Sequence, residues 1–112
     1  MIRQETFDFL KDLIRNNNRE WFQLNKDRYE AARENVVEFT VALLHAVHTI
    51  DENVDENLDP KKCVMRIYRD IRFSKDKTPY KDYFGVSIPT KGLKPGRAEY
   101  LLRKNSLSAG AA

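Results

Sequence analysis

The residues with the clearest chemical potential lie between positions 66 and 81. This segment carries six lysine or arginine side chains and two aspartates, a local net charge of +4 in a chain whose total is +3. Such a local concentration of charge indicates a partner of opposite sign. Guanidinium groups bind phosphate or carboxylate in a two-pronged geometry, and lysines add mobile point charges. The segment therefore predicts a site for an anion.

The charged residues of this segment alternate as they would along a β-strand. Arg66, Asp70 and Arg72 share one parity, and strand residues two apart lie roughly 6.5 Å from each other. One carboxylate can then brace two guanidinium groups whose other donors stay available. Arg69 falls on the apolar parity, which implies either a bulge or a buried, paired charge. The predicted ligand-binding positions are Arg66, Arg69, Asp70, Arg72, Asp76, Lys77, Tyr80 and Lys81.

Three functions fit this segment. The first is an anion-binding domain for a phosphate- or carboxylate-bearing ligand, which includes an enzyme acting on a small phosphorylated substrate. The second is a nucleic-acid-binding module that uses Tyr68, Tyr80 and Phe84 as stacking faces. The third is a purely structural strand whose ion pairs bind no ligand. The small anion ranks first, because the interleaved aspartates and the modest total charge disfavour nucleic acid.

Other reactive residue types predict no metal, cofactor or catalytic group. His45 and His48 have no acidic residue at a neighbouring helical position, so we expect exposed histidines rather than metal ligands. The lone Cys63 cannot form an internal disulfide and reads as a buried thiol. No apolar signal region and no membrane-length run is present. We therefore expect a cytoplasmic protein without a membrane partner, and the residues leave open whether it is an enzyme.

Around the charged segment, the chain predicts an α+β fold in a single domain, 1–112. The helical part covers 5–50, and the triple asparagine 16–18 breaks it. The first helix is expected to be capped by Thr6, and Asn17 with Glu20 has the spacing of a capping box for the next. A long amphipathic helix follows, because apolar residues recur at helical spacing. Its apolar stripe contains Tyr29, Ala32, Val36, Thr40, Leu43, Val47 and Ile50.

The second part of the chain, 62–104, predicts a small, mainly antiparallel sheet. Alternation from Cys63 to Phe73 is typical of a strand. Further strands are expected at Tyr83–Ile88 and Ala98–Arg103, with a hairpin-like connection between them. The tail 105–112 offers little with which to pack. Whether the stretch Asn16–Tyr29 contributes to the site stays open, because sequence alone does not establish spatial proximity.

Two stretches of the chain resemble a known family. NNNREWFQLNKDRYE at 16–30 and RIYRDIRFSKDKTPYK at 66–81 are similar to bacterial domain-of-unknown-function family 2461, whose members carry RxxRDxRF followed by DKxPYK. The resemblance spans nearly the whole chain and implies no activity. It implies these signature positions: Arg66, Arg69, Asp70, Arg72, Phe73, Asp76, Lys77, Tyr80 and Lys81.

The resemblance also carries an expectation about length. Family members are considerably longer, so this chain is expected to be the N-terminal part of a larger domain. An incomplete sheet would expose an unpaired edge, which favours self-association.

Overall fold

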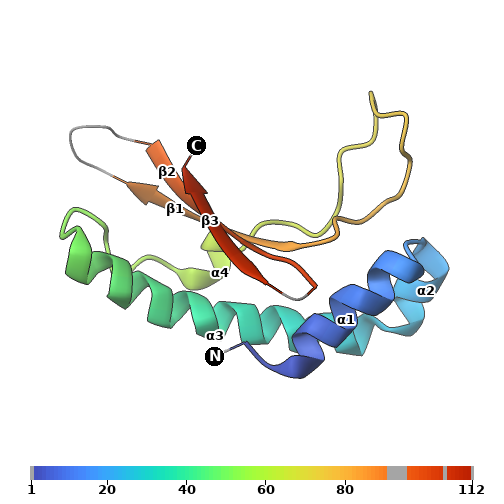
Figure 1. Cartoon of the computed structure of the whole chain (residues 1–112), viewed down its shortest axis with the longest axis horizontal. Coiled ribbons are helices and arrows are strands. Elements are labelled where there is room, and N and C mark those ends of the chain that lie inside the picture. Colours follow the sequence, from blue (N-terminus) through green and yellow to red (C-terminus); the bar gives the residue numbers. More distant parts are fainter. Residues whose placement is uncertain (1, 91–95, 105, 112) are drawn as a thin grey trace.

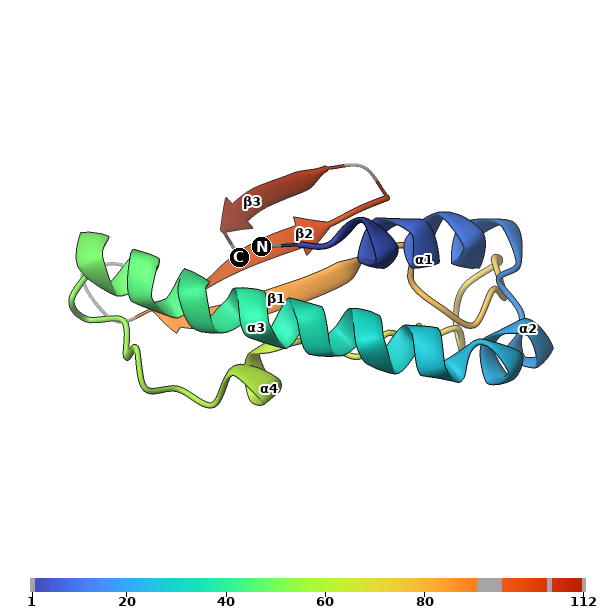
Figure 2. The same ribbon diagram turned by 90° about the horizontal axis from the view of Figure 1, so that it is seen from below.

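The fold is described from a computed structural model, which describes residues 2–90, 96–104 and 106–111. Four helices precede a three-stranded antiparallel sheet of order β1-β2-β3. The sheet lies across the long helix α3, and α1 lies beside the first half of α3 (Figures 1 and 2). This arrangement confirms the predicted α+β class. Among the described residues, no helix combines the length and apolar character needed to cross a membrane.

Helix α1 (Gln4–Arg15) begins earlier than the sequence predicts. Thr6 was expected as its N-cap but lies inside the first turn, where its hydroxyl donates to Asn35 Oδ1 at 2.7 Å. The same oxygen accepts the backbone N–H of Arg3 at 2.8 Å. A buried amide on α3 therefore holds the start of α1. The helix is amphipathic, and Phe9, Leu10 and Leu13 line its buried face.

The asparagine run ends α1 as predicted, but its members have different roles. Asn18, not Asn17, caps α2 (Arg19–Leu24), because its side-chain oxygen accepts the Trp21 N–H at 2.8 Å. Asn16 turns back to the Asp12 carbonyl at 2.9 Å. Asn17 is thereby left for a partner distant in sequence.

Helix α3 (Lys26–Ile50) is the predicted long helix. Ala32, Val36 and Leu44 form its buried stripe, together with Thr40, whose hydroxyl donates to the Val36 carbonyl. Ile50 was expected in this stripe but is 90% exposed, because the helix extends beyond the layer it covers.

The strand predicted from Cys63 to Phe73 does not form. Residues Pro60–Cys63 make the short helix α4, because Asp59 caps it by accepting the Lys61 N–H and Pro60 occupies a first-turn position. The chain then runs extended, with isolated β-bridges Val64↔Val86 and Tyr68↔Tyr80. It turns into a loop after Arg69, whose side chain is held by loop oxygens. The buried thiol of Cys63 agrees with prediction.

The sheet consists of β1 (Phe84–Thr90), β2 (Gly96–Leu102) and β3 (Leu107–Ala111). The first two strands fall near the predicted ranges, and the connection expected at 89–97 lies partly within them and partly outside the described residues. The third strand forms in the predicted tail, where backbone pairing with β2 from Leu102↔Leu107 to Ala98↔Ala111 needs no apolar pattern. The β1 face made by Phe84, Val86 and Ile88 is buried in the core with α1 and α3.

Candidate functional site

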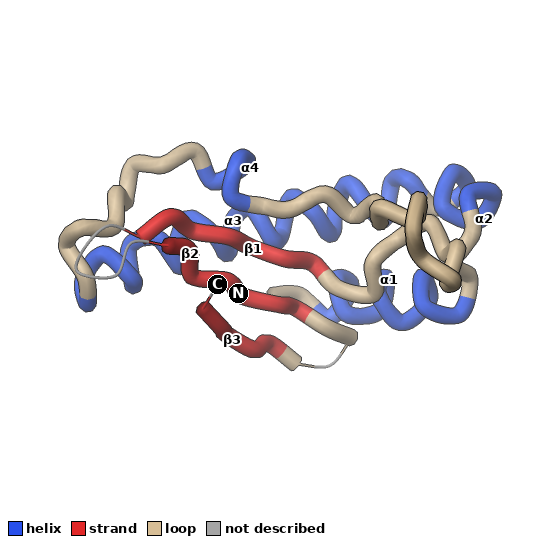
Figure 3. Tube along the Cα trace, turned by 90° about the horizontal axis from the view of Figure 1, so that it is seen from above, coloured by secondary structure: helices blue, strands red, loops and turns tan. Residues whose placement is uncertain are grey.

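The predicted site residues lie on one loop and at its base. The base is closed by the Tyr68↔Tyr80 bridge, by Arg69 N–H donating to the Pro79 carbonyl at 2.9 Å and by Lys81 N–H donating to the Ile67 carbonyl at 2.7 Å. We call residues 70–79 the basic loop. It extends from the end of the molecule where α1 meets α2 (Figures 1 and 3).

Asn17 joins the helical half of the chain to this base. Its Nδ2 donates to the Tyr80 carbonyl at 2.9 Å, and its Oδ1 accepts the Tyr80 N–H at 3.1 Å. The side-chain amide thus pairs with both backbone groups of a residue 63 positions later. The stretch Asn16–Tyr29 therefore does contribute to the site's framework, a question that the sequence leaves open.

The side chain of Arg69, at the base of the basic loop, organises that loop. Its Nη1 donates to the Thr78 carbonyl at 2.9 Å, to Thr78 Oγ1 at 2.7 Å and to the Asp76 carbonyl at 3.3 Å. Its Nη2 reaches Ser74 Oγ at 3.4 Å, and Asp76 Oδ2 lies 3.4 Å from Nη1. The Arg69 guanidinium, which the strand alternation places among apolar residues, therefore organises the loop.

Two aspartates of the basic loop are engaged within it. Asp70 forms a two-pronged pair with Arg72, with Nε–Oδ1 at 3.0 Å and Nη2–Oδ2 at 2.9 Å. Asp76 Oδ1 accepts both the N–H and the hydroxyl of Thr78 at 2.9 Å. Hydrogen bonds from Arg72 lower the pKa of Asp70, and hydrogen bonds from Thr78 followed by the charge of Arg69 lower the pKa of Asp76. Both carboxylates are thereby held in their charged form.

The aromatic residues at the base are used for packing. The Tyr80 ring is 2% exposed and stacks on Phe22 with centroids 4.2 Å apart. Phe84 is buried as well. Of the three stacking faces expected for nucleic acid, only Tyr68 reaches solvent, at 48% exposure. Burial at the junction of helices and sheet withdraws the other two rings from any ligand.

Arg66 and Lys81 differ from these engaged residues. Neither side chain makes a hydrogen bond or ion pair with any residue that the structure describes. The Lys81 ammonium lies 5.9 Å from the centre of the Tyr83 ring. Burial, and then the neighbouring charge of Arg66, lower the pKa of Lys81. The base of the loop therefore holds two cations that no carboxylate of a described residue contacts as an ion pair, although the charge of Arg66 contributes to the lowered pKa of Asp70.

A polar hollow of about 460 Å³ opens beside Lys81. Its three aspartates have cationic partners: Asp70 pairs with Arg72, Asp76 with Arg69, and Asp82 with Arg103 at 3.4 Å. Of the eight predicted ligand-binding positions, it brings together Arg69, Asp70, Asp76, Tyr80 and Lys81. Lys77 donates instead to the Ile71 carbonyl at 2.6 Å.

The comparison with protein families settles where the chain belongs. The family model described as "Conserved hypothetical protein (DUF2461)" matches residues 5–111. The chain is a member of that family. No curated protein and no solved structure gives a significant match. The family membership agrees with the resemblance noted from the sequence and brings no activity with it.

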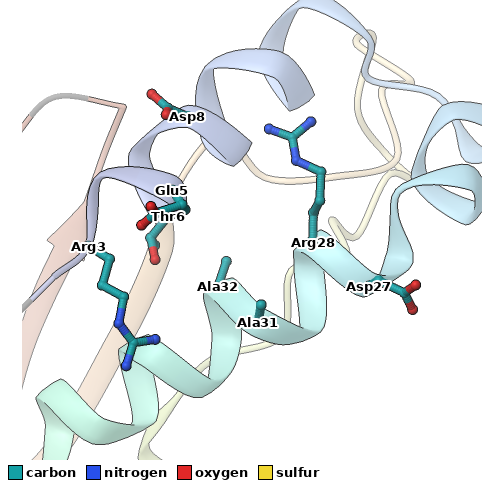
Figure 4. A pocket seen from close by; sticks show the side chains of 8 residues that line it. All are labelled: Arg3, Glu5, Thr6, Asp8, Asp27, Arg28, Ala31 and Ala32. Atoms are coloured by element: carbon teal, nitrogen blue, oxygen red, sulfur yellow. The ribbon is translucent and has the colours of Figure 1, made fainter.

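The DUF2461 domain also has a hollow that sequence reasoning missed. About 550 Å³ lie between α1 and α3, over Ala31 and Ala32 (Figure 4). The arginines at its rim are neutralised nearby, Arg3 by Glu38 at 3.1 Å and Arg28 by Asp12 at 2.8 Å. Two consecutive alanines on a helix that packs against another are the sequence signal for such a gap, because small side chains leave space between helices.

The histidines of the DUF2461 domain lie at the other end of α3. His45 Nδ1 is 2.9 Å from Glu56 Oε2, and His48 Nδ1 donates to the Val54 carbonyl at 2.6 Å. Within the described ranges, no three His, Cys, Asp or Glu side chains are grouped to hold a metal. These contacts fasten the 51–59 connection to the helix that precedes it.

Proposed function

We propose that this domain binds a small phosphate- or carboxylate-bearing anion at Arg66 and Lys81. The observation that carries the proposal is that neither side chain forms a hydrogen bond or ion pair with a described residue, while Lys81 lines an open polar hollow. Two like charges held together raise the free energy of the folded protein, and an anion placed between them relieves that repulsion.

The surrounding residues support an anion rather than a cation. The three aspartates of the hollow are each engaged by an arginine, so Lys81 and Arg66 supply the charge that remains. Arg66 provides a planar group for two-pronged binding, and Lys81 a compact charge from the opposite side of the loop base. The signature positions implied by the resemblance then divide into a structural set around Arg69 and a binding pair.

Catalysis on a small phosphorylated substrate would use the same two cations to hold the phosphoryl group. The purely structural interpretation accounts for Arg69, which is surrounded by loop oxygens, but it leaves Arg66 and Lys81 without an ion pair among the described residues. A small anion is favoured over nucleic acid at this position, because the nearby rings of Tyr80 and Phe84 are buried.

Isothermal titration calorimetry with inorganic phosphate, pyrophosphate and citrate tests the proposal. Arg66→Met and Lys81→Met remove one charge each while keeping an extended apolar chain, and each should weaken binding at least tenfold. Lys11→Met is the matched control, because this exposed lysine lies on α1 and does not line the hollow. Equal binding by the Arg66→Met/Lys81→Met double variant, or no binding by the parent chain, would refute the proposal.

The lowered pKa of Lys81 gives a second readout. A bound anion favours the protonated ammonium and raises that pKa, so binding at alkaline pH should take up protons. Calorimetry in two buffers of different ionisation enthalpy measures this uptake. The uptake should disappear in Lys81→Met.

A further inference from the structure

The basic loop displays an aromatic ring that the anion site does not use. Phe73 is 94% exposed, more than any other large apolar side chain among the described residues. The Arg72 guanidinium lies 5.7 Å from the centre of its ring. A phenylalanine this exposed adds nothing to the core, so its ring is available to a partner.

The loop that carries Phe73 is ordered by its own hydrogen bonds. Arg69 holds Ser74, Asp76 and Thr78, and Lys77 holds the Ile71 carbonyl at 2.6 Å. A loop fixed in this way loses little conformational freedom when it binds a partner, which favours affinity. The fold therefore presents Phe73 on a rigid support.

A groove of about 640 Å³ lies beside the loop. Ile71 and Pro79 supply apolar lining, and Asn18, Arg19 and Lys77 supply polar groups. Arg19 makes no hydrogen bond or ion pair within the described part of the chain, and the same holds for Lys75 on the loop. Because Asp70 and Asp76 are engaged by Arg72 and Arg69, the charge left around Phe73 is positive.

We infer that the Phe73 face of the basic loop binds single-stranded nucleic acid, with one base stacked on Phe73 and phosphates at Arg19, Lys75 and Lys77. An exposed aromatic ring together with cations that have no ion pair among the described residues, such as Arg19 and Lys75, is a combination that binds single strands irrespective of sequence. A duplex keeps its base faces covered, so an exposed ring selects an unstacked base.

An anionic membrane is the competing partner for an aromatic ring among cations. Membrane binding by a loop needs more apolar surface than one ring, and here Ile71 is half-buried while Ser74 and Thr78 are polar. The groove at Arg19, Ile71 and Lys77 also matches a base and its phosphate better than a flat bilayer. These features favour the single strand.

Fluorescence anisotropy with a labelled oligothymidylate about 15 nucleotides long tests this inference at low salt. Phe73→Ala should weaken binding about tenfold, the usual effect of one lost stacking contact. Phe73→Trp should bind at least as tightly as the parent, whereas Phe73→Leu should bind as weakly as Phe73→Ala, since leucine is apolar but has no ring. Ile50→Ala is the matched control, because Ile50 is 90% exposed at the other end of the molecule and should be neutral.

The salt dependence checks the phosphate contacts. Three contacts predict a slope of about −2 for the logarithm of the binding constant against the logarithm of salt concentration, and Lys75→Met should reduce its magnitude by about 0.7. The inference is overturned if the parent chain binds no oligothymidylate at low salt, or if Phe73→Leu binds like the parent. Binding of phosphatidylserine vesicles without oligothymidylate would assign the loop to a membrane instead. Phosphate calorimetry of Phe73→Ala should be unchanged, so the two proposals can fail separately.

Discussion

The two long connections of this domain lie near opposite ends of α3 and use similar turn chemistry with opposite results (Figure 1). In the 51–59 connection, Asp51 and Asp55 each accept the backbone N–H two residues ahead. In the basic loop, Asp76 does the same for Thr78. Yet Val54 of the 51–59 connection is fully buried in the core, whereas Phe73 of the basic loop is almost fully exposed to solvent.

We interpret the 51–59 connection as one that serves the fold and the basic loop as one that, in our proposal, serves a partner. The 51–59 connection carries five acidic residues and no lysine or arginine, and Glu56 fastens it to His45. Its two apolar residues, Val54 and Leu58, pack in or against the core. The basic loop is fastened equally well by Arg69, so the exposure of Phe73 is a built feature and not a sign of weak structure.

The contrast between Val54 and Phe73 predicts the largest effect on stability. Val54→Ala removes two buried methyl groups and should lower the free energy of unfolding by about 2 kcal/mol, as transfer and cavity costs add. Phe73→Ala should change it by less than about 0.5 kcal/mol, because an exposed ring contributes little. Urea unfolding followed by circular dichroism measures both. A larger loss in Phe73→Ala than in Val54→Ala would contradict the comparison.

Arg69 provides the next largest effect. Arg69→Ala should cost about 1.5 kcal/mol, because a partly buried guanidinium leaves several loop oxygens without their donor. Amide hydrogen exchange should show the loss of protection concentrated in residues 70–79. Arg72→Ala is the control, since its solvent-exposed pair with Asp70 should contribute little to stability.

In the 51–59 connection, we expect a smaller effect on stability. Glu56→Gln removes the partner of His45, an exposed contact that should contribute about 0.5 kcal/mol. Glu52→Gln, which removes an equal charge from the same connection, should have less effect. Thermal unfolding of the two variants side by side measures the difference. Equal melting temperatures would show that Glu56 does not fasten the connection.

The smallest effect is a dependence on pH. The pKa of Asp76 is lower in the folded protein than its ordinary value of about 3.9. Its contribution to stability is therefore full above that ordinary value and is lost as the pH falls through the lowered pKa. Unfolding curves between about pH 5 and pH 2 should show this loss, and Asp76→Asn should flatten it. An unchanged pH profile in Asp76→Asn would contradict the proposed role.

The sequence predicts the helical half well, because periodicity and asparagine breaks are local signals. The strand predicted from the alternation between Cys63 and Phe73 does not form. The path of this segment is decided by distant partners, namely Val86, Tyr80 and the oxygens around Arg69. The sequence does not predict the β3 strand, because its backbone pairing with β2 needs no apolar pattern. The charged segment is visible in the sequence, but the engagement of Arg69 and the isolation of Arg66 depend on how the loop closes.

The two hydrogen bonds between the Asn17 side chain and the Tyr80 backbone have a consequence for the order of folding. The asparagine is synthesised 63 residues before its partner, so the helical half must wait for most of the chain before this contact can close. Bringing such distant positions together is among the slower steps of folding. We therefore expect the hollow and the basic loop to acquire their shape late. A substitution at Asn17 should delay that moment more than it alters the secondary structure already in place.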